Sequence, residues 1–193
     1  RYLGSVINEQ GEMEAEIINR VTNATKVYYA LNKVFIKKRE VSLETKIKIF
    51  KTVYEPVLLY SGETWTLSTS NRSKIQACEM RYLRAAIGVT RRDRIRNEQI
   101  RDKCNVISTL TKLETKQLLW FGHMARMSEQ RKVKQIWKMG VDKKRKRGRP
   151  ARTWNGEVGK TLTARGMNWR EAEQLAVNRD AWRGRSAPYT STP

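Results

Sequence analysis

The residues best suited to chemistry in this chain are two clusters of basic side chains. The first cluster comprises Arg91, Arg92, Arg94, Arg96 and Arg101, and the second comprises Lys143, Lys144, Arg145, Lys146, Arg147, Arg149 and Arg152. Guanidinium and ammonium groups at such density bind polyanions, because each of them can neutralise a phosphate and release its counterion. Both clusters therefore predict contact with RNA or DNA.

Side chains suited to catalysis are sparse by comparison. Two-metal phosphoryl transfer requires closely spaced carboxylates, and none of the four aspartates is adjacent to another. The single histidine, His123, and the two cysteines, Cys78 and Cys104, are too few for a Cys/His zinc site and form no Cys-x-x-Cys pattern. His123 is interpreted as a packing residue, and Cys78 as a thiol in an apolar helix stripe. We expect a chain that binds without catalysing, with no metal ligands and no cofactor of its own.

The overall charge agrees with a polyanionic partner. The 193 residues carry 40 Lys and Arg against 19 Asp and Glu, for a net charge of +21. Residues 89–153 hold 20 of these basic and 6 of these acidic side chains, so two thirds of the excess lies there. No apolar run approaches the roughly 20 residues that cross a bilayer, so no membrane partner is expected. Two reduced cysteines and the basic runs predict an intracellular protein, nuclear and cytoplasmic.

Apolar periodicity predicts that helices position the N-terminal half. Residues 1–7 alternate as a short strand, and residues 13–35 carry an apolar stripe with steps of three and four, as in one long amphipathic helix. A second stripe over residues 43–54 follows Ser42, a suitable cap, and Pro56 is expected to kink or end that helix. The predicted fold class is mainly α, with a multi-helical bundle after the short strand.

The arginine cluster lies just beyond a third predicted helix, which Thr69 or Ser70 opens and Gly88 closes. Thr90 and Asp93 have the spacing of a capping box, so a short helical turn should follow. The arginines then project from more than one face of short helices.

Further helices are predicted after Ser108, Ser128, Thr153 and Asn168, the last with Glu171 as a capping-box partner. Three tryptophans, at positions 154, 169 and 182, are interpreted as anchors of a small helical subdomain, with base stacking as the alternative. Gly148 and Pro150 exclude a helix in the second basic cluster, which is expected to be an exposed strand or loop.

Five separated blocks resemble the end of the reverse transcriptase of non-LTR (LINE-type) retrotransposons, which also encode an endonuclease. The blocks are Tyr2-Leu3-Gly4-Ser5, Pro56-Val57-Leu58-Leu59-Tyr60-Ser61-Gly62-Glu63-Thr64-Trp65, Leu83-Arg84 with Gly88 and Asp93-Arg94-Ile95-Arg96-Asn97, Trp120-Phe121-Gly122-His123-Met124-Ala125-Arg126-Met127, and Arg147-Gly148-Arg149-Pro150 with Thr153-Trp154. They occur in the family's order over nearly the whole chain. The chain departs from the pattern at Ser61, inserted between Tyr60 and Gly62, at Asn178, and in lacking a zinc knuckle after the thumb.

The resemblance implies a division of the chain. Residues 1–10 would be the last palm strand, with Tyr2, Leu3 and Gly4 near the primer grip, and residues 11–88 a helical thumb. The rest would be the element's C-terminal domain. The residues themselves divide that part into a basic helical domain at 89–142, a basic linker at 143–153, a small helical subdomain at 154–185 and a disordered tail at 186–193. The resemblance also implies that the catalytic aspartates and their Mg²⁺ belong to a palm upstream of Arg1. The partners would be that palm, template-primer RNA and DNA, and target DNA.

Two alternatives remain from the residues alone. Arg147-Gly148-Arg149-Pro150 is similar to the core of an AT-hook, in which extended Arg-Gly-Arg enters a narrow minor groove, so a stand-alone chromatin-binding helical module is a second interpretation. The run from Lys143 to Arg147 is also typical of a nuclear-import signal.

Overall fold

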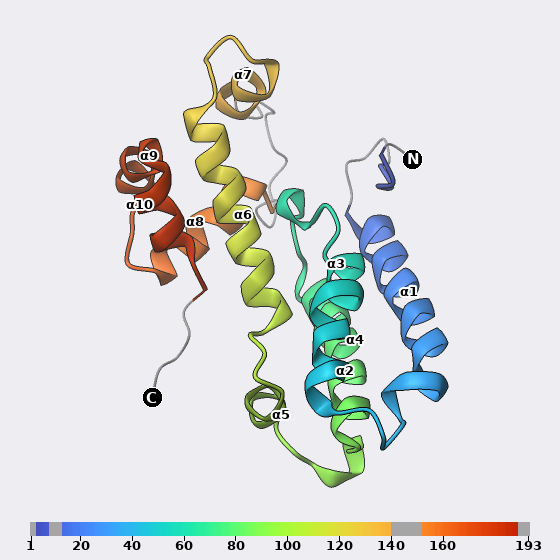
Figure 1. The fold of residues 1–193 in the computed structure, drawn as a ribbon. Helices are drawn as coiled ribbons and strands as arrows, with labels where there is room; N and C mark the ends of the chain where they lie inside the picture. Colours follow the sequence, from blue (N-terminus) through green and yellow to red (C-terminus); the bar gives the residue numbers. More distant parts are fainter. Residues whose placement is uncertain (1–2, 8–12, 140–151, 189–193) are drawn as a thin grey trace. The chain divides into compact units, whose positions relative to one another are not determined.

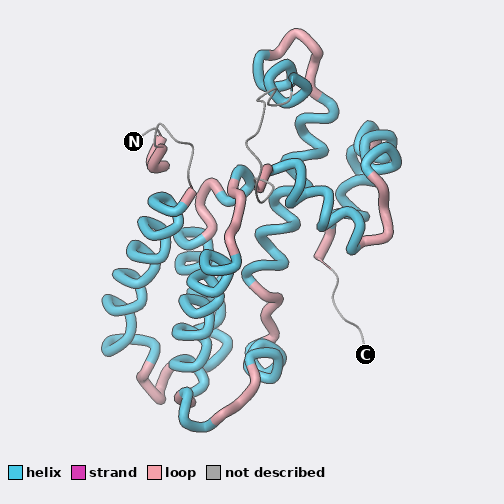
Figure 2. Tube along the Cα trace, turned by 180° about the vertical axis from the view of Figure 1, so that it is seen from behind, coloured by secondary structure: helices cyan, strands magenta, loops and turns pink. Residues whose placement is uncertain are grey.

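The computed structural model describes residues 3–7, 13–139 and 152–188. Over these residues the chain is helical, and Figure 2 shows helices and loops without a strand. The chain divides into two compact units, Arg1–Leu113 and Glu114–Pro193. Each has its own apolar core, which confirms a mainly α protein.

The first unit is built from helices that run side by side in Figure 1. In chain order its elements are α1 (Glu14–Leu31), the π-helical turn η1 (Asn32–Ile36), α2 (Leu43–Ile49), the π-helical turn η2 (Phe50–Tyr54), α3 (Glu55–Leu58), the 3₁₀ turn η3 (Gly62–Thr64), α4 (Thr69–Ile87), the 3₁₀ turn η4 (Arg91–Asp93), α5 (Asn97–Cys104) and the first residues of α6 (Thr109–Arg126). The predicted stripe of α1 is confirmed, because Ile17, Ala24 and Tyr28 are buried against this core.

Local signals set the ends of these helices as predicted. The Ser42 hydroxyl accepts a hydrogen bond from Thr45 N at 3.2 Å and caps α2. Gly88 ends α4 with φ at +75°, a left-handed conformation that glycine adopts without steric cost. α4 begins at Thr69, as expected, although the capping side chain is that of Ser68, which accepts from Asn71 N at 3.0 Å.

Pro56 does not end the helix, which was one of the two predicted outcomes, and the turn before it is not an ordinary α-turn. The preceding turn, η2, widens to π-helical form, and Glu55 N donates to the carbonyl of Phe50 five residues back. Because proline has no N–H and crowds the carbonyl four residues before it, a wider turn accommodates it without breaking the helix. The helical path therefore continues through Pro56 into α3.

Aromatic rings fill the centre of the first unit. Tyr54 lies 4.8 Å from Tyr82 and 5.7 Å from Phe50 between ring centroids. The Tyr54 hydroxyl donates to the carbonyl of Cys78 at 2.9 Å and lies 3.0 Å from its Sγ. Cys78 is 1% exposed, which confirms it as a packed thiol, and burial raises its pKa.

The same core extends beyond the predicted thumb-like segment. Ile100 and Cys104 of α5, then Val106 and Leu113, are buried in the first unit's cluster. They therefore pack with the helices before residue 88, although the sequence placed them in a separate region. The absence of a side chain at Gly62 leaves room for Leu113 in this core, because a Cβ at position 62 would overlap the Leu113 side chain.

The second unit contains the rest of α6, α7 (Lys132–Met139), α8 (Trp154–Ala164), α9 (Trp169–Val177) and α10 (Arg179–Ser186). Its aromatic centre is Phe121, whose ring centroid lies 5.7 Å from Trp137, 5.1 Å from Trp169 and 5.3 Å from Trp182. Trp182 is 1% exposed and donates through Nε1 to the carbonyl of Leu118 at 2.9 Å. The packing of Trp169 and Trp182 confirms the predicted anchoring role and leaves the buried Trp182 no open face for stacking.

Three local predictions were wrong within the described residues. Leu3 and Gly4 form a turn, and Ser5 has only an isolated bridge, because a lone segment has no neighbouring strand to pair with. The helix expected from Ser128 begins at Lys132, after a turn. His123 is exposed beside Trp120, with ring centroids 5.2 Å apart, and is not packed inside.

Candidate nucleic-acid interface

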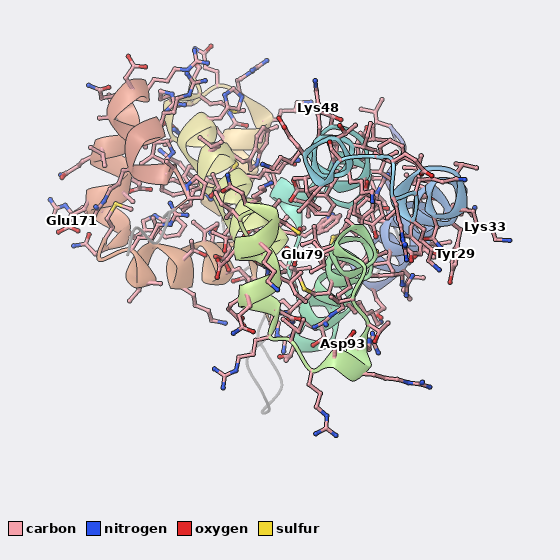
Figure 3. The ribbon with its side chains drawn as sticks, turned by 60° about the horizontal axis from the view of Figure 1, so that its bottom comes forward. Tyr29, Lys33, Lys48, Glu79, Asp93 and Glu171 are labelled. Carbon is pink, nitrogen blue, oxygen red and sulfur yellow. The ribbon has the colours of Figure 1, made fainter. Side chains whose placement is uncertain are left out.

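The first basic cluster lies on a braced loop, residues 89–97, which we name the arginine loop. At its start the Asp93 carboxylate accepts hydrogen bonds from Thr90 N at 2.6 Å and from Thr90 Oγ1 at 2.9 Å, which confirms the predicted capping box. The hydrogen bond from the Thr90 backbone N–H lowers the pKa of the Asp93 carboxyl group most, and the hydrogen bond from the Thr90 hydroxyl lowers it further. Asp93 is therefore an anion held by its own turn, and Figure 3 labels it at the edge of the first unit.

Arg84 braces the loop from α4. Its guanidinium donates to the carbonyl of Thr90 at 3.2 Å, to the carbonyl of Ile95 at 2.8 Å and to Asn97 Oδ1 at 3.0 Å. The fixed fork of an arginine suits such a set of acceptors, because several N–H groups point outward from one plane. One side chain thus joins both ends of the arginine loop to α4.

The brace leaves four guanidinium groups facing solvent. Arg91, Arg92, Arg94 and Arg96 are exposed, and none of their side chains has a partner among the described residues. Arg94 adopts φ of +53°, a left-handed conformation that is uncommon for a residue with a Cβ, at the end of the 3₁₀ turn η4. The loop therefore presents four positive charges on a short, hydrogen-bonded backbone.

Arg101 was predicted to belong with these four, and the structure gives it a different role. Its Nε and Nη2 lie 3.1 Å and 2.8 Å from the two carboxylate oxygens of Glu79, which is 0% exposed. The hydrogen bond to Glu79 raises the pKa of Arg101. Thr109 N also donates to Glu79 at 3.1 Å. Arg101 therefore neutralises a buried carboxylate and joins α5 to α4, so it is left out of the interface.

A second basic surface, which sequence reasoning missed, adjoins the start of the loop. Lys37, Lys38 and Arg39, with Lys46 of α2, line a cavity of about 510 Å³ that ends at Thr90. The Lys37–Arg39 run was not among the binding residues predicted from the sequence. Its adjacency to Thr90 depends on how α1 and α4 pack, which no local pattern predicts.

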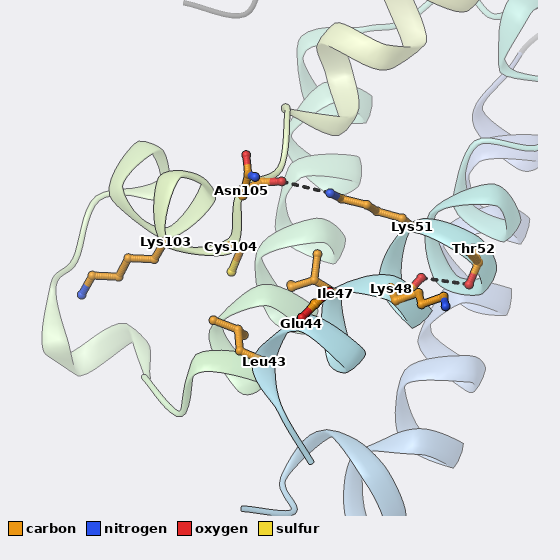
Figure 4. Close-up of a pocket in the computed structure, with 9 residues that line it drawn as sticks. All are labelled: Leu43, Glu44, Ile47, Lys48, Lys51, Thr52, Lys103, Cys104 and Asn105. Carbon is orange, nitrogen blue, oxygen red and sulfur yellow. Dashed lines mark hydrogen bonds between the residues drawn. The ribbon is translucent and has the colours of Figure 1, made fainter. Parts of the chain in front are cut away.

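A further cavity, of about 650 Å³, lies between α2 and α5 (Figure 4). Its floor is apolar, and three lysines, Lys48, Lys51 and Lys103, stand around it with Glu44. The Lys51 ammonium donates to the carbonyl of Asn105 at 3.0 Å, so part of this charge already serves to hold the α5 end. Because Glu44 adds a negative charge, this cavity is less suited to binding a polyanion than the one lined by Lys37, Lys38, Arg39 and Lys46.

The second basic cluster lies almost wholly outside the described residues. Lys143, Lys144, Arg145, Lys146, Arg147 and Arg149 fall there, and so does the AT-hook-like core. Arg152 is described and exposed, just before Thr153, whose hydroxyl accepts from Gly156 N at 3.1 Å and caps α8. The role predicted for this cluster remains a prediction.

The segment predicted to lie near a primer grip is held by α1 and Tyr60. Tyr2 falls outside the described residues, whereas the carbonyl of Leu3 accepts from the Tyr60 hydroxyl at 2.8 Å and that of Gly4 from Arg20 at 2.5 Å. The Arg20 guanidinium stacks over the Tyr60 ring, 4.4 Å from its centroid, and pairs with Glu16 at 2.5 Å. Residues 3 and 4 therefore have a fixed position on the first unit.

The described ranges contain neither a metal-ligand cluster nor a helix that could span a bilayer. No group of three or more His, Cys, Asp or Glu side chains there could hold a metal ion. None of the helices in residues 3–7, 13–139 and 152–188 is long and apolar enough to cross a membrane.

Comparison with known proteins gives a distant relative. The chain is 25% identical over 175 residues to a transposon-derived protein of Caenorhabditis elegans, an alignment that covers 85% of this chain and 60% of that protein. The chain therefore spans about 60% of the length of the curated relative it matches, and the match supports a transposon origin. No protein-family model matches the chain. No solved structure matches it.

Proposed function

We propose that this chain is the part of a non-LTR retrotransposon reverse transcriptase that follows the polymerase palm, and that its first unit binds the backbone of template-primer or target nucleic acid. Support comes from the transposon-derived relative and from the five blocks of family resemblance. In this proposal the palm supplies the catalytic aspartates and Mg²⁺, and the chain is inactive by itself.

One of the resembling blocks builds the arginine loop. Arg84 braces the loop, Gly88 ends α4, Asp93 closes the capping box, and Asn97 accepts from Arg84. The motif residues therefore shape the loop, while the arginines between them, Arg91 and Arg92 among them, remain available. This division suits a surface whose backbone is fixed and whose charged side chains contact phosphate.

The observation that carries the proposal is the set of four exposed arginines without protein partners. Each guanidinium that neutralises a phosphate of B-form DNA contributes about −0.9 to the slope of log affinity against log salt. Four such contacts would contribute about −3.6. Holding the loop in advance also lowers the ordering cost of binding.

The test compares two variants of equal charge. In one, Arg91, Arg92, Arg94 and Arg96 are all changed to Gln, and in the control four exposed cations of the second unit, Arg131, Lys132, Arg170 and Arg183, are changed to Gln. Affinity for a short RNA–DNA hybrid is measured by fluorescence anisotropy at several salt concentrations. We expect the loop variant to lose about two to four units of salt slope and the control to lose less than one. Equal losses would show that binding depends on net charge alone and would refute the arginine loop as the interface.

A further inference from the structure

The cavity between the end of η1 and the end of α4 has an unbalanced charge. Four of the residues that line it, Lys37, Lys38, Arg39 and Lys46, are cationic, and no carboxylate is among its lining residues. The nearest acidic residues along the chain, Glu40 and Glu44, are exposed, and Glu44 lines the other cavity. Asp93, beyond Thr90, is engaged by its own turn.

Lys46 is the residue that makes this cavity unusual. It is only 7% exposed, yet no described residue forms an ion pair or hydrogen bond with its ammonium group. Only its backbone is occupied, since the carbonyl accepts from the Tyr82 hydroxyl at 2.9 Å and the N–H donates to the carbonyl of Ser42 at 3.1 Å. The Lys46 nitrogen is not one of the enclosed polar atoms without a partner, so the buried part is the aliphatic stem and the ammonium group reaches the solvent in the cavity.

A second lysine of the described residues is also largely buried, but its ammonium group has protein acceptors. Lys134, 5% exposed, donates to the carbonyl of Ala125 at 2.6 Å and lies 3.6 Å from a Glu129 oxygen. Lys112, which is partly buried, is likewise bound to Glu55 at 2.6 Å. Lys46 is therefore an ammonium without an acceptor, placed among three further cations.

We propose that this cavity is a phosphate-binding site, with Lys46 as its inner ligand and Lys37, Lys38 and Arg39 at its mouth. A phosphate group supplies several acceptor oxygens and negative charge, which is what the lining lacks. The volume of about 510 Å³ holds such a group with water. The phosphate belongs either to a nucleic-acid backbone or to a free polyphosphate, and the site does not rest on the proposed function of the arginine loop.

The experiment uses the full chain and two matched variants of α2. Lys46→Met removes the ammonium but keeps most of the buried stem, and Lys48→Met removes an exposed ammonium that faces the other cavity. Tripolyphosphate binding is measured by calorimetry at constant ionic strength, and the thermal midpoint without anion checks the fold. We expect Lys46→Met to weaken binding about tenfold, the effect of one charge-assisted hydrogen bond, and Lys48→Met to change it less than twofold.

A second variant protects the test against a folding defect. Lys37→Gln with Lys38→Gln alters exposed side chains only, and it should also weaken tripolyphosphate binding severalfold. Unchanged binding in both the Lys46 and the Lys37 and Lys38 variants, or an equal loss in Lys48→Met, would overturn the proposal.

Competition with a short RNA–DNA hybrid identifies the source of the phosphate. If Lys46→Met also weakens hybrid binding, the site holds a backbone phosphate, and if only tripolyphosphate binding falls, the ligand is a free polyphosphate. The arginine-loop variant should keep tripolyphosphate affinity, so failure of the loop proposal is distinguishable from failure of this one.

Discussion

Changing Glu79 to Gln should destabilise the first unit strongly. The Glu79 carboxylate is 0% exposed and accepts two hydrogen bonds from Arg101 and one from Thr109 N, at 2.8–3.1 Å. A neutral amide keeps the shape but removes the charge that Arg101 faces, and its NH₂ cannot accept. Removing one partner of a buried pair costs about 3–5 kcal/mol, and because Arg101 keeps some solvent access we expect about 3 kcal/mol.

The matched control acts on the same arginine. A carboxylate oxygen of Glu98 lies 3.8 Å from Nη1 of Arg101, but the Glu98 side chain is 74% exposed. Solvent screens such a pair, so Glu98→Gln should cost less than about 0.5 kcal/mol. The contrast between the two variants isolates burial as the cause, since both remove one carboxylate from Arg101.

Urea titration read by hydrogen exchange and mass spectrometry measures the effect separately in the two units. Peptides from α4 report on the first unit and peptides from α9 on the second. At a denaturant dependence of about 1.5 kcal/mol per molar, a loss of 3 kcal/mol moves the α4 midpoint down by about 2 M. An α4 midpoint within 0.5 M of that of Glu98→Gln would refute the reasoning that Glu79 holds α4, α5 and α6 together.

Three further predictions concern single positions. Arg84→Met should speed hydrogen exchange of residues 89–97 at least tenfold and weaken hybrid binding severalfold; unchanged exchange would refute its role as the brace. Gly122→Ala should lower the stability of the second unit by about 3 kcal/mol in urea titration, because its Cβ would overlap the Trp182 indole, and a loss below 1 kcal/mol would contradict the packing. Burial raises the pKa of Cys104 to about 11, so the reactive thiolate is scarce below that pH. The rate of its alkylation by iodoacetamide should therefore rise about tenfold per pH unit between pH 8 and pH 10. A rate that instead levels off near pH 9 would show that Cys104 has an ordinary thiol pKa and would contradict its burial.

Much of the fold was predictable because helix signals are local. The caps at Ser42, Thr153 and Asn168 and the left-handed end at Gly88 all involve residues three or four positions apart, so the sequence displays them directly. The π-helical turn before Pro56 was not predicted, because its width depends on packing against the aromatic core as well as on the proline.

The site was less predictable, because its contacts join residues that lie far apart in the sequence. Arg101 and Glu79 are 22 positions apart, so nothing in the sequence distinguishes Arg101 from its neighbours Arg94 and Arg96. Burial of Lys46 is likewise a tertiary effect, since a lysine in an amphipathic helix is expected to be exposed. Charge density identified the region, and only the fold separated the arginines that hold the protein together from those that face solvent.

The π-helical turn η2 accommodates one extra residue in the helical path from α2 to α3. A π-turn contains about one residue more than an α-turn, so deletion of a single residue between 50 and 53 would convert it to an α-turn and leave the following residues on nearly the same helix face. Glu55, which lies 2.6 Å from Lys112 and 3.2 Å from Thr109 Oγ1, would keep its direction toward both. The same deletion inside an ordinary α-turn would rotate the following residues by about 100°, so η2 is the place in this helical path where the loss of one codon changes helix phase least.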